Sequence, residues 1–111
     1  MNILDKINEV IDDQKEFYKE FIDELPSKKS IKKTEKLLNR LHSKNLFEDD
    51  LLVIADGGLC LVFRKEQKTM YFEVYNDNEM GYLIDENNKI LANKDLKKIA
   101  DVEKTIYDFL K

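Results

Sequence analysis

The sequence predicts an α+β fold in the order ααββββα: a helical hairpin, an antiparallel meander of about four strands and a C-terminal helix. The spacing of apolar residues, which changes twice along the chain, supports this order. Apolar residues recur every three to four residues up to residue 46, every two residues from residue 51, and every three to four again near the C-terminus. No repeat or Gly/Ser-rich linker divides the 111 residues, so we expect a single domain over 1–111, helical at 1–46 and with the sheet and last helix at 51–111.

The two N-terminal helices follow from an amphipathic pattern and one proline. Over residues 3–25 the apolar positions share one stripe of a helix, broken only by the polar Gln14. Pro26 should end this helix, because the residue before a proline avoids helical geometry. A second helix should begin after Ser27 or with Ser30 as its N-cap, since serine side chains accept hydrogen bonds from the first helical N–H groups.

The sheet follows from period-two alternation and from short turns rich in Asp, Asn and Gly. Links this short make neighbouring strands antiparallel. We expect Ile90 and Leu91 to form only a short edge piece after the last full strand, and Asp95 to be the N-cap of a final helix from Leu96 to Lys111. The expected strands are 51–55, 59–65, 69–76 and 80–85.

Alternation also predicts which side chains share a face of the sheet. One face should be covered by the helices and should contain Leu59, Leu61, Phe63, Met70, Phe72, Val74, Met80, Tyr82 and Ile84. The other face should contain Cys60, Val62, Arg64, Tyr71, Glu73, Tyr75, Leu83 and Asp85. This second set is too apolar for an ordinary wetted surface and too charged for a sealed core, so something could cover part of it.

Charge is distributed unevenly along the chain. The net charge is −4, which argues against bulk attraction to nucleic acid. However, residues 1–26 carry eight carboxylates and three lysines, whereas residues 27–45 carry seven cations and one carboxylate. The single cysteine cannot close an intramolecular disulfide, and the N-terminus lacks the pattern of a signal peptide. We therefore expect a cytoplasmic protein.

Few side chains suit catalysis, metal binding or a cofactor. One histidine and one cysteine are too few for a transition-metal site, so we expect His42 to be a surface or structural residue and Cys60 a small buried hydrophobe. Several carboxylates near one predicted hairpin, among them Glu73 and Asp77, could hold a hard cation. Turns select the same residue types, so a solvated turn is the expected role. The sequence predicts no catalytic residue, no metal site and no cofactor.

One segment of the sheet resembles small uncharacterised bacterial and mobile-element proteins. The shared features are the turn Asp56-Gly57-Gly58, the apolar strand that follows it and ends in Phe63, and the next hairpin around Asp77. The resemblance covers about residues 54–85 and implies a sheet, without implying an activity. The chain has Asn78 where a turn glycine is expected.

The leading hypothesis is a small interaction protein, regulator-like or inhibitor-like, that binds a protein partner through a helix face or the aromatic outer sheet face. The partner could be a second copy of the chain. The N-terminal helix has near-heptad spacing, which suits burial in its own core or contact with a partner. The residues expected to bind the partner are Phe17, Tyr18, Phe21, Tyr71, Tyr75 and Leu83.

Two alternatives belong to other classes of function. The first is a metal-dependent enzyme that uses the carboxylates near Glu73 and Asp77. The second is nucleic-acid binding by the basic second helix, although no aromatic or additional arginine residues accompany its lysines. The possible nucleic-acid contacts are Lys28, Lys29, Lys32, Lys33, Lys36 and Arg40.

Overall fold

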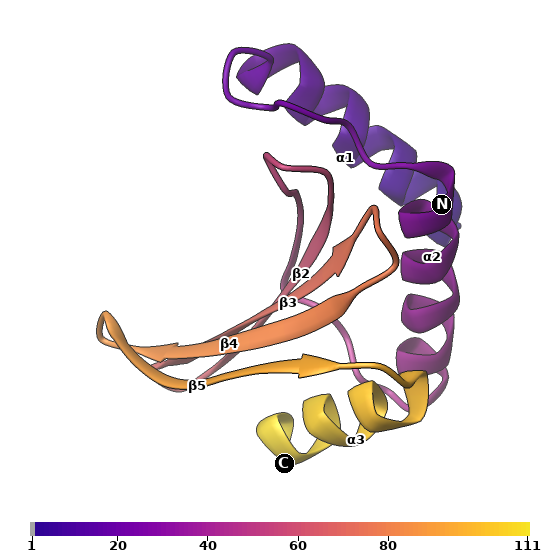
Figure 1. Ribbon diagram of the computed structural model, residues 1–111. Coiled ribbons are helices and arrows are strands. Elements are labelled where there is room, and N and C mark those ends of the chain that lie inside the picture. The colour runs from indigo at the N-terminus through magenta and orange to yellow at the C-terminus, as the bar shows by residue number, and fades with distance from the viewer. Residues whose placement is uncertain (1) are drawn as a thin grey trace.

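The computed structural model describes residues 2–111 apart from the side chains of Phe17 and Tyr18, and within this part of the chain five strands form one antiparallel sheet (Figure 1). Each strand pairs with the next along the chain, which confirms the predicted meander and the α+β class with one more strand than expected. The strands are β1 (Asp50–Val53), β2 (Gly58–Lys65), β3 (Lys68–Tyr75), β4 (Met80–Glu86) and β5 (Lys89–Leu96). The helices are α1 (Ile3–Tyr18), α2 (Lys28–Ser43) and α3 (Ile99–Leu110).

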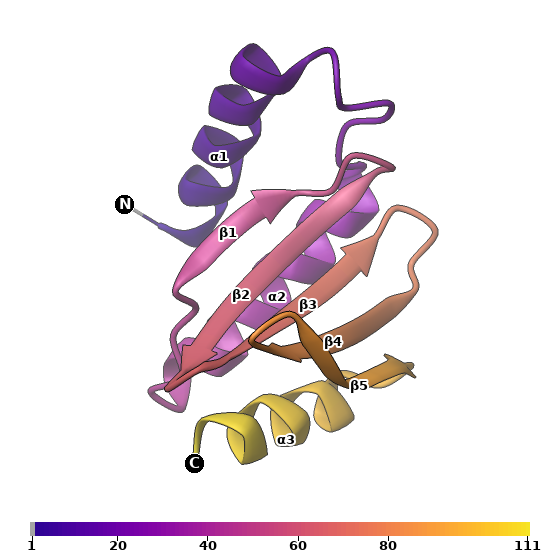
Figure 2. The same ribbon diagram turned by 90° about the vertical axis from the view of Figure 1, so that its left-hand side faces the viewer.

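The register of the strands confirms the predicted division into two faces. Leu61 pairs with Phe72, and Phe72 pairs with Tyr82, so these side chains lie on one face. Helix α2 lies behind this inner face in Figure 2, with α1 alongside β1 and α3 at the opposite margin. Side chains from all three helices and the inner face form one buried cluster. Its fully buried members include Ile7, Leu37, Leu41, Phe63, Phe72, Val102 and Ile106.

Tight turns keep the strands adjacent. Asn87 and Asn88 form the β4–β5 turn with φ of 51° and 67°, the left-handed geometry that asparagine tolerates and that fits the twist of a hairpin. Asn78, in the β3–β4 turn, also has a positive φ of 76°. Asparagine therefore adopts there the conformation for which a glycine was expected.

The first helix ends earlier than the sequence predicts. Helix α1 stops at Tyr18 rather than near Leu25, because the following segment turns back and its backbone bonds to the turn between β1 and β2. The N–H groups of Asp23 and Glu24 donate to the carbonyl of Ala55, at 2.8 and 3.3 Å. Phe21 consequently leaves the helical stripe and is 71% exposed.

The side chain of Asn76 connects this returning segment to α2. Its Oδ1 accepts hydrogen bonds from Ser27 N at 2.8 Å and Ser30 Oγ at 2.9 Å, and its Nδ2 donates to the carbonyl of Leu25 at 2.9 Å. Ser27 is the N-cap of α2, so the helix begins after Ser27, the first of the two predicted starts, and Ser30 is not the cap; Ser27 Oγ accepts a hydrogen bond from Ser30 N. The connection between the helices is thus held by one side chain of the β3–β4 turn.

The last strand and the last helix also differ from the prediction. Ile90 and Leu91 belong to an eight-residue strand, because β5 pairs with β4 at every residue except Leu91, which forms a bulge. Asp95 pairs with Gly81 in this ladder and is therefore no helix cap. Helix α3 begins only at Ile99, after Lys98, whose side chain makes no capping hydrogen bond.

Candidate protein-interaction surface

The outer face of the sheet, the face opposite the helices, carries a mixture of apolar, aromatic and acidic side chains. In Figure 2, which looks toward this face, no described helix crosses in front of it. The strand register confirms that Tyr71 and Leu83 are direct neighbours on it, with Tyr75 on the same face. The positions that share the outer face by register are Asp50, Leu52, Gly58, Cys60, Val62, Arg64, Thr69, Tyr71, Glu73, Tyr75, Gly81, Leu83, Asp85, Ile90, Asn93 and Asp95.

The middle of the outer face is well packed although no described helix covers it. Val62 is 1% exposed and Cys60 is 8% exposed. Their cross-strand neighbours on β3 are Tyr71 and Glu73, whose longer side chains are half-buried beside them. Burial raises the pKa of the Cys60 thiol to about 12, with further contributions from the nearby carboxylates of Glu73 and Asp50. Cys60 therefore behaves as a protonated, apolar side chain near neutral pH.

The charges on the outer face are mainly negative. Its described positions include four carboxylates and one cation, Arg64. Arg64 Nη2 lies 3.8 Å from Asp50 Oδ2, so this cation already has an acidic neighbour. The pKa of Tyr75 lies well above its usual value, because of burial first and then because of the Glu73 carboxylate beside its hydroxyl. The four carboxylates are Asp50, Glu73, Asp85 and Asp95.

One carboxylate oxygen of this face, Asp85 Oδ1, is buried without a hydrogen-bond donor among the described residues. A buried acceptor without a donor costs about 1–3 kcal/mol.

Phe21 adds an exposed aromatic ring next to one margin of the outer face. It lines a hollow of about 340 Å³ together with Gln14, Ile22, Val53 and Ala55. Leu52, which belongs to the outer face, lines the same hollow. The structure therefore brings Phe21 close to the sheet surface. Phe17 and Tyr18 were also expected to bind the partner, but their side chains lie outside the part of the chain that the structure describes.

Leu52 and Ile90 belong to this surface but were not among the residues predicted for it. Leu52 follows from the alternation of β1 once Leu51 is placed on the inner face. Ile90, which is 60% exposed, could not be assigned to a face of the sheet from the alternation of residues along β5. Leu91 is an extra residue opposite the step from Ile84 to Asp85, and this bulge shifts the alternation of β5.

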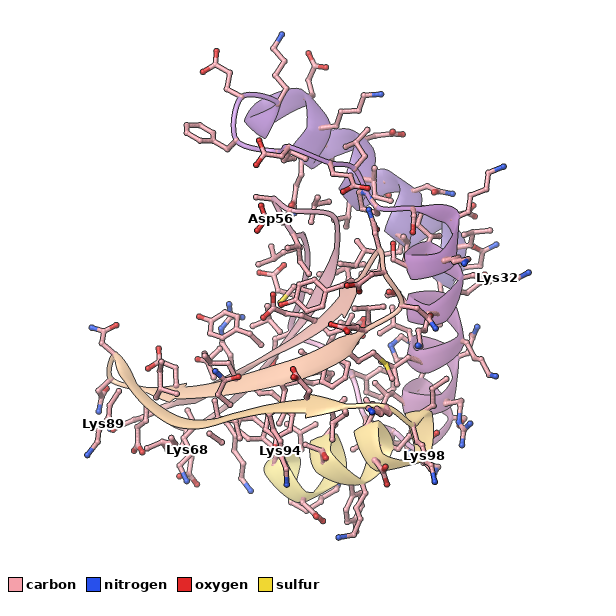
Figure 3. The ribbon with its side chains drawn as sticks, viewed as in Figure 1. Lys32, Asp56, Lys68, Lys89, Lys94 and Lys98 are labelled. Atoms are coloured by element: carbon pink, nitrogen blue, oxygen red, sulfur yellow. The ribbon has the colours of Figure 1, made fainter. Side chains whose placement is uncertain are left out.

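A second surface, on α2, is cationic. It contains a hollow of about 750 Å³ whose lining includes the predicted nucleic-acid contacts Lys29, Lys32, Lys33, Lys36 and Arg40, together with Ile99 of α3. Lys32 points away from the sheet in Figure 3, and Lys98 lies at the start of α3. Lys28 is exposed at the first turn of α2. The outer sheet face and the α2 surface thus have opposite charge.

Two of these cations already have partners. Lys33 Nζ donates to Asn78 O at 2.9 Å and to Asn78 Oδ1 at 3.0 Å. Arg40 pairs with the buried carboxylate of Glu103 on α3, as does Lys44. The hydrogen bond from Lys44 and the charge of Arg40 hold the pKa of Glu103 below its usual value. Arg40 thus fastens α3 to α2 and is less available to a ligand than the lysines.

The residues that the sequence analysis considered for metal binding or catalysis do not form a common site. Glu73 is on the outer face, whereas Asp77 is in the β3–β4 turn, where its Oδ1 accepts a hydrogen bond from Glu79 N at 3.0 Å. His42 Nε2 lies 2.9 Å from Glu48 Oε2. Among the described residues, no group of three or more His, Cys, Asp or Glu side chains is placed to hold a metal ion.

No helix of the described chain has the length and apolar character needed to cross a membrane.

Comparisons with protein-family models, with curated proteins and with solved structures found no significant match to this chain.

Proposed function

We propose that this chain is a protein-interaction module that binds a protein partner through the outer face of its sheet. One observation carries the proposal. Helices α2 and α3 pack against the inner face and α1 lies along β1, so no described helix covers the outer face, on which Tyr71, Tyr75 and Leu83 are half-buried and Ile90 is exposed. Partly exposed aromatic and apolar side chains beside polar ones are typical of protein interfaces, in which tyrosine is enriched.

The partner should bind the face of the sheet rather than add a strand to its edges. At the β1 edge, Val53 N donates to Gln14 Oε1 at 2.7 Å, so α1 covers the free backbone there. At the β5 edge, the bulge at Leu91 and the charged Lys94, which shares the inner-face register with Tyr82, hinder strand addition. Both features protect edge strands in natural sheets.

The test requires a purified partner. Proteins retained by the wild-type chain from extracts of its source cells would be purified, and their affinity would be measured by calorimetry. A Tyr71→Ser/Leu83→Ser variant should lower the affinity at least tenfold, while a Lys32→Ser/Lys36→Ser variant of α2 should retain it. Circular dichroism would establish that both variants are folded.

Two results would contradict the proposal. One is a partner that binds the Tyr71→Ser/Leu83→Ser variant as tightly as the wild type. The other is a chain that light scattering shows to be strictly monomeric and that retains no partner. Self-association that is lost in the same variant would support the proposal with a second copy as the partner.

Nucleic-acid binding by α2 is a second candidate function, favoured by the lysine-lined hollow. Lysines attract phosphates without sequence preference, so binding should weaken steeply as salt rises. Gel retardation of DNA and RNA at low salt would test it. Unchanged mobility, or retardation that persists in the Lys32→Ser/Lys36→Ser variant, would exclude this role for α2.

The remaining expectations about cellular context stay predictions. These are the cytoplasmic location and the similarity to bacterial and mobile-element proteins. Fractionation of the source cells would test the location.

A further inference from the structure

We propose that the partner of the outer sheet face is a protein segment rich in Lys and Arg with apolar residues between them. This inference rests on the proposed function, because it specifies the chemistry of a partner that binds the same face. It follows from the charges, the aromatic rings and the hydrogen-bond acceptors of that face, and from the opposite charge on α2.

Charge complementarity is the first argument. Glu73, Asp85 and Asp95 are spread across β3, β4 and β5, whereas Arg64 is the one cation among the described outer-face positions and lies next to Asp50. An anionic partner would have to desolvate these carboxylates without compensating them, which is costly. A cationic partner would pair with them.

The tyrosine rings are the second argument. Tyr71 and Tyr75 alternate with Glu73 along β3, so each ring has a carboxylate as its neighbour on the same face. Arg and Lys side chains stack on tyrosine rings and gain about 0.5–2 kcal/mol from cation–π attraction, according to how far the contact is desolvated. Their apolar stems would cover Leu83 at the same time.

The hydrogen-bonding capacity of the carboxylates is the third argument. Among the ion pairs of the described residues, none involves Asp85 or Asp95, so these two carboxylates have no cation of this chain as a partner. Lysine and arginine side chains supply several donors and no acceptor, and therefore suit a face of carboxylates.

The cationic surface on the other side of the molecule is the fourth argument. Lys29, Lys32 and Lys36 lie on α2, on the side of the sheet opposite the outer face. A cationic segment is repelled from α2 and attracted to the outer face, so the field of the whole molecule would orient the encounter. An anionic ligand would be steered to α2 instead.

The probe is a short synthetic peptide of alternating Arg, Lys and Leu, compared with a peptide in which every cation is replaced by Glu. Backbone NMR shifts should change on β2, β3 and β4 with the cationic peptide and not with the acidic peptide. Affinity should fall as salt rises. A Glu73→Gln/Asp85→Asn variant should bind the cationic peptide about tenfold more weakly than the wild type.

A matched control separates this site from general attraction to an acidic protein. The Glu9→Gln/Asp12→Asn variant changes the net charge equally but on the exposed face of α1, and should bind as the wild type does. Equal loss in both variants, or peptide shifts confined to α1, would overturn the inference. Equal binding of the acidic and cationic peptides would also overturn it.

The two proposals can fail separately. A purified protein partner that loses affinity for the Tyr71→Ser/Leu83→Ser variant but binds the Glu73→Gln/Asp85→Asn variant normally would contradict the cationic segment and support the proposed function. A second copy of the chain, or a nucleic acid, found on the outer face would also contradict the cationic segment. Loss of affinity in both variants supports both proposals.

Discussion

Two buried carboxylates connect segments that are distant in the chain. The side chain of Glu48 is 3% exposed and accepts hydrogen bonds from Lys6 of α1 at 2.8 Å and from His42 of α2 at 2.9 Å. Burial raises the pKa of Glu48, but the hydrogen bonds from Lys6 and His42 outweigh burial and hold it below its usual value. Glu103 is held in its charged form in the same way by Lys44 and Arg40.

These lowered pKa values predict an acid-sensitive fold. The unfolded chain keeps a carboxyl pKa near 4.5, so the folded state binds fewer protons in acid than the unfolded state does. The stability from both groups is therefore complete above about pH 5 and is lost as the pH falls through the lower, folded pKa values. Urea unfolding as a function of pH measures this loss.

Glutamine variants identify the groups responsible. A Glu48→Gln/Glu103→Gln protein should be less stable than the wild type near neutral pH and should lose less stability between about pH 5 and pH 3. A Glu9→Gln/Glu16→Gln protein, changed at exposed positions of α1, serves as the control. If the wild type and the Glu48→Gln/Glu103→Gln variant have the same pH profile, the two carboxylates do not account for the acid sensitivity.

Cys60 should be unreactive while the protein is folded. With a pKa of about 12 and 8% exposure, its thiolate is scarce near neutral pH and its sulfur is shielded. Alkylation by iodoacetamide should be at least about 100-fold slower than that of a free cysteine, and should become fast in urea. Mass spectrometry over time would measure both rates, and fast alkylation of the native protein would show that this part of the outer face is open.

Gln14 is the polar break in the apolar stripe of α1, and its amide has a structural role at the sheet edge. Its Oε1 accepts from Val53 N at 2.7 Å and its Nε2 donates to Leu51 O at 3.5 Å. Gln14→Leu would complete the stripe and should still destabilise the fold by about 1–2 kcal/mol, because the β1 edge loses its partner. Gln14→Glu keeps the acceptor for Val53 and should cost less. Urea midpoints compare them, and a more stable Gln14→Leu protein would contradict this role.

Helix α3 lacks a side-chain cap, and supplying one should stabilise the protein. Lys98 is the N-cap residue with extended backbone angles, φ −114° and ψ 138°, which suit a capping serine. Lys98→Ser should raise the free energy of unfolding by about 1 kcal/mol, whereas Lys97→Ser, one residue earlier, should leave it nearly unchanged. Thermal melts test the pair, and equal melting temperatures for the two variants would argue against the cap.

A cluster that draws buried side chains from all three described helices and the sheet predicts cooperative unfolding of 1–111 as a single domain. The division into one domain stays a prediction until this is measured. Far-UV circular dichroism and tyrosine fluorescence should report coincident urea transitions. Separate transitions for the helical part and the sheet would show two folding units.

The residues of the outer face could largely be found from the sequence, but its exposure could not. Alternation placed Tyr71, Tyr75 and Leu83 on one side of the sheet, because successive side chains of a strand point to opposite faces. Whether a helix covers that side depends on where α1 packs. The structure places α1 beside β1 and leaves the outer face free of described helices.

Patterns within a short stretch of chain were enough to predict the α+β class and the helix-covered face of the sheet, and they offered a start of the second helix after Ser27 as one of two alternatives. Such preferences arise from each residue and its near neighbours, so they can be read without a fold. Only the tertiary structure decided that α1 ends at Tyr18, that β5 extends to Leu96 and that Arg40 binds Glu103. In each case another segment of the chain supplies the hydrogen-bond or charge partner, so the polar groups exchange bonds with water for bonds with that segment. The local sequence does not show which segment will be the partner.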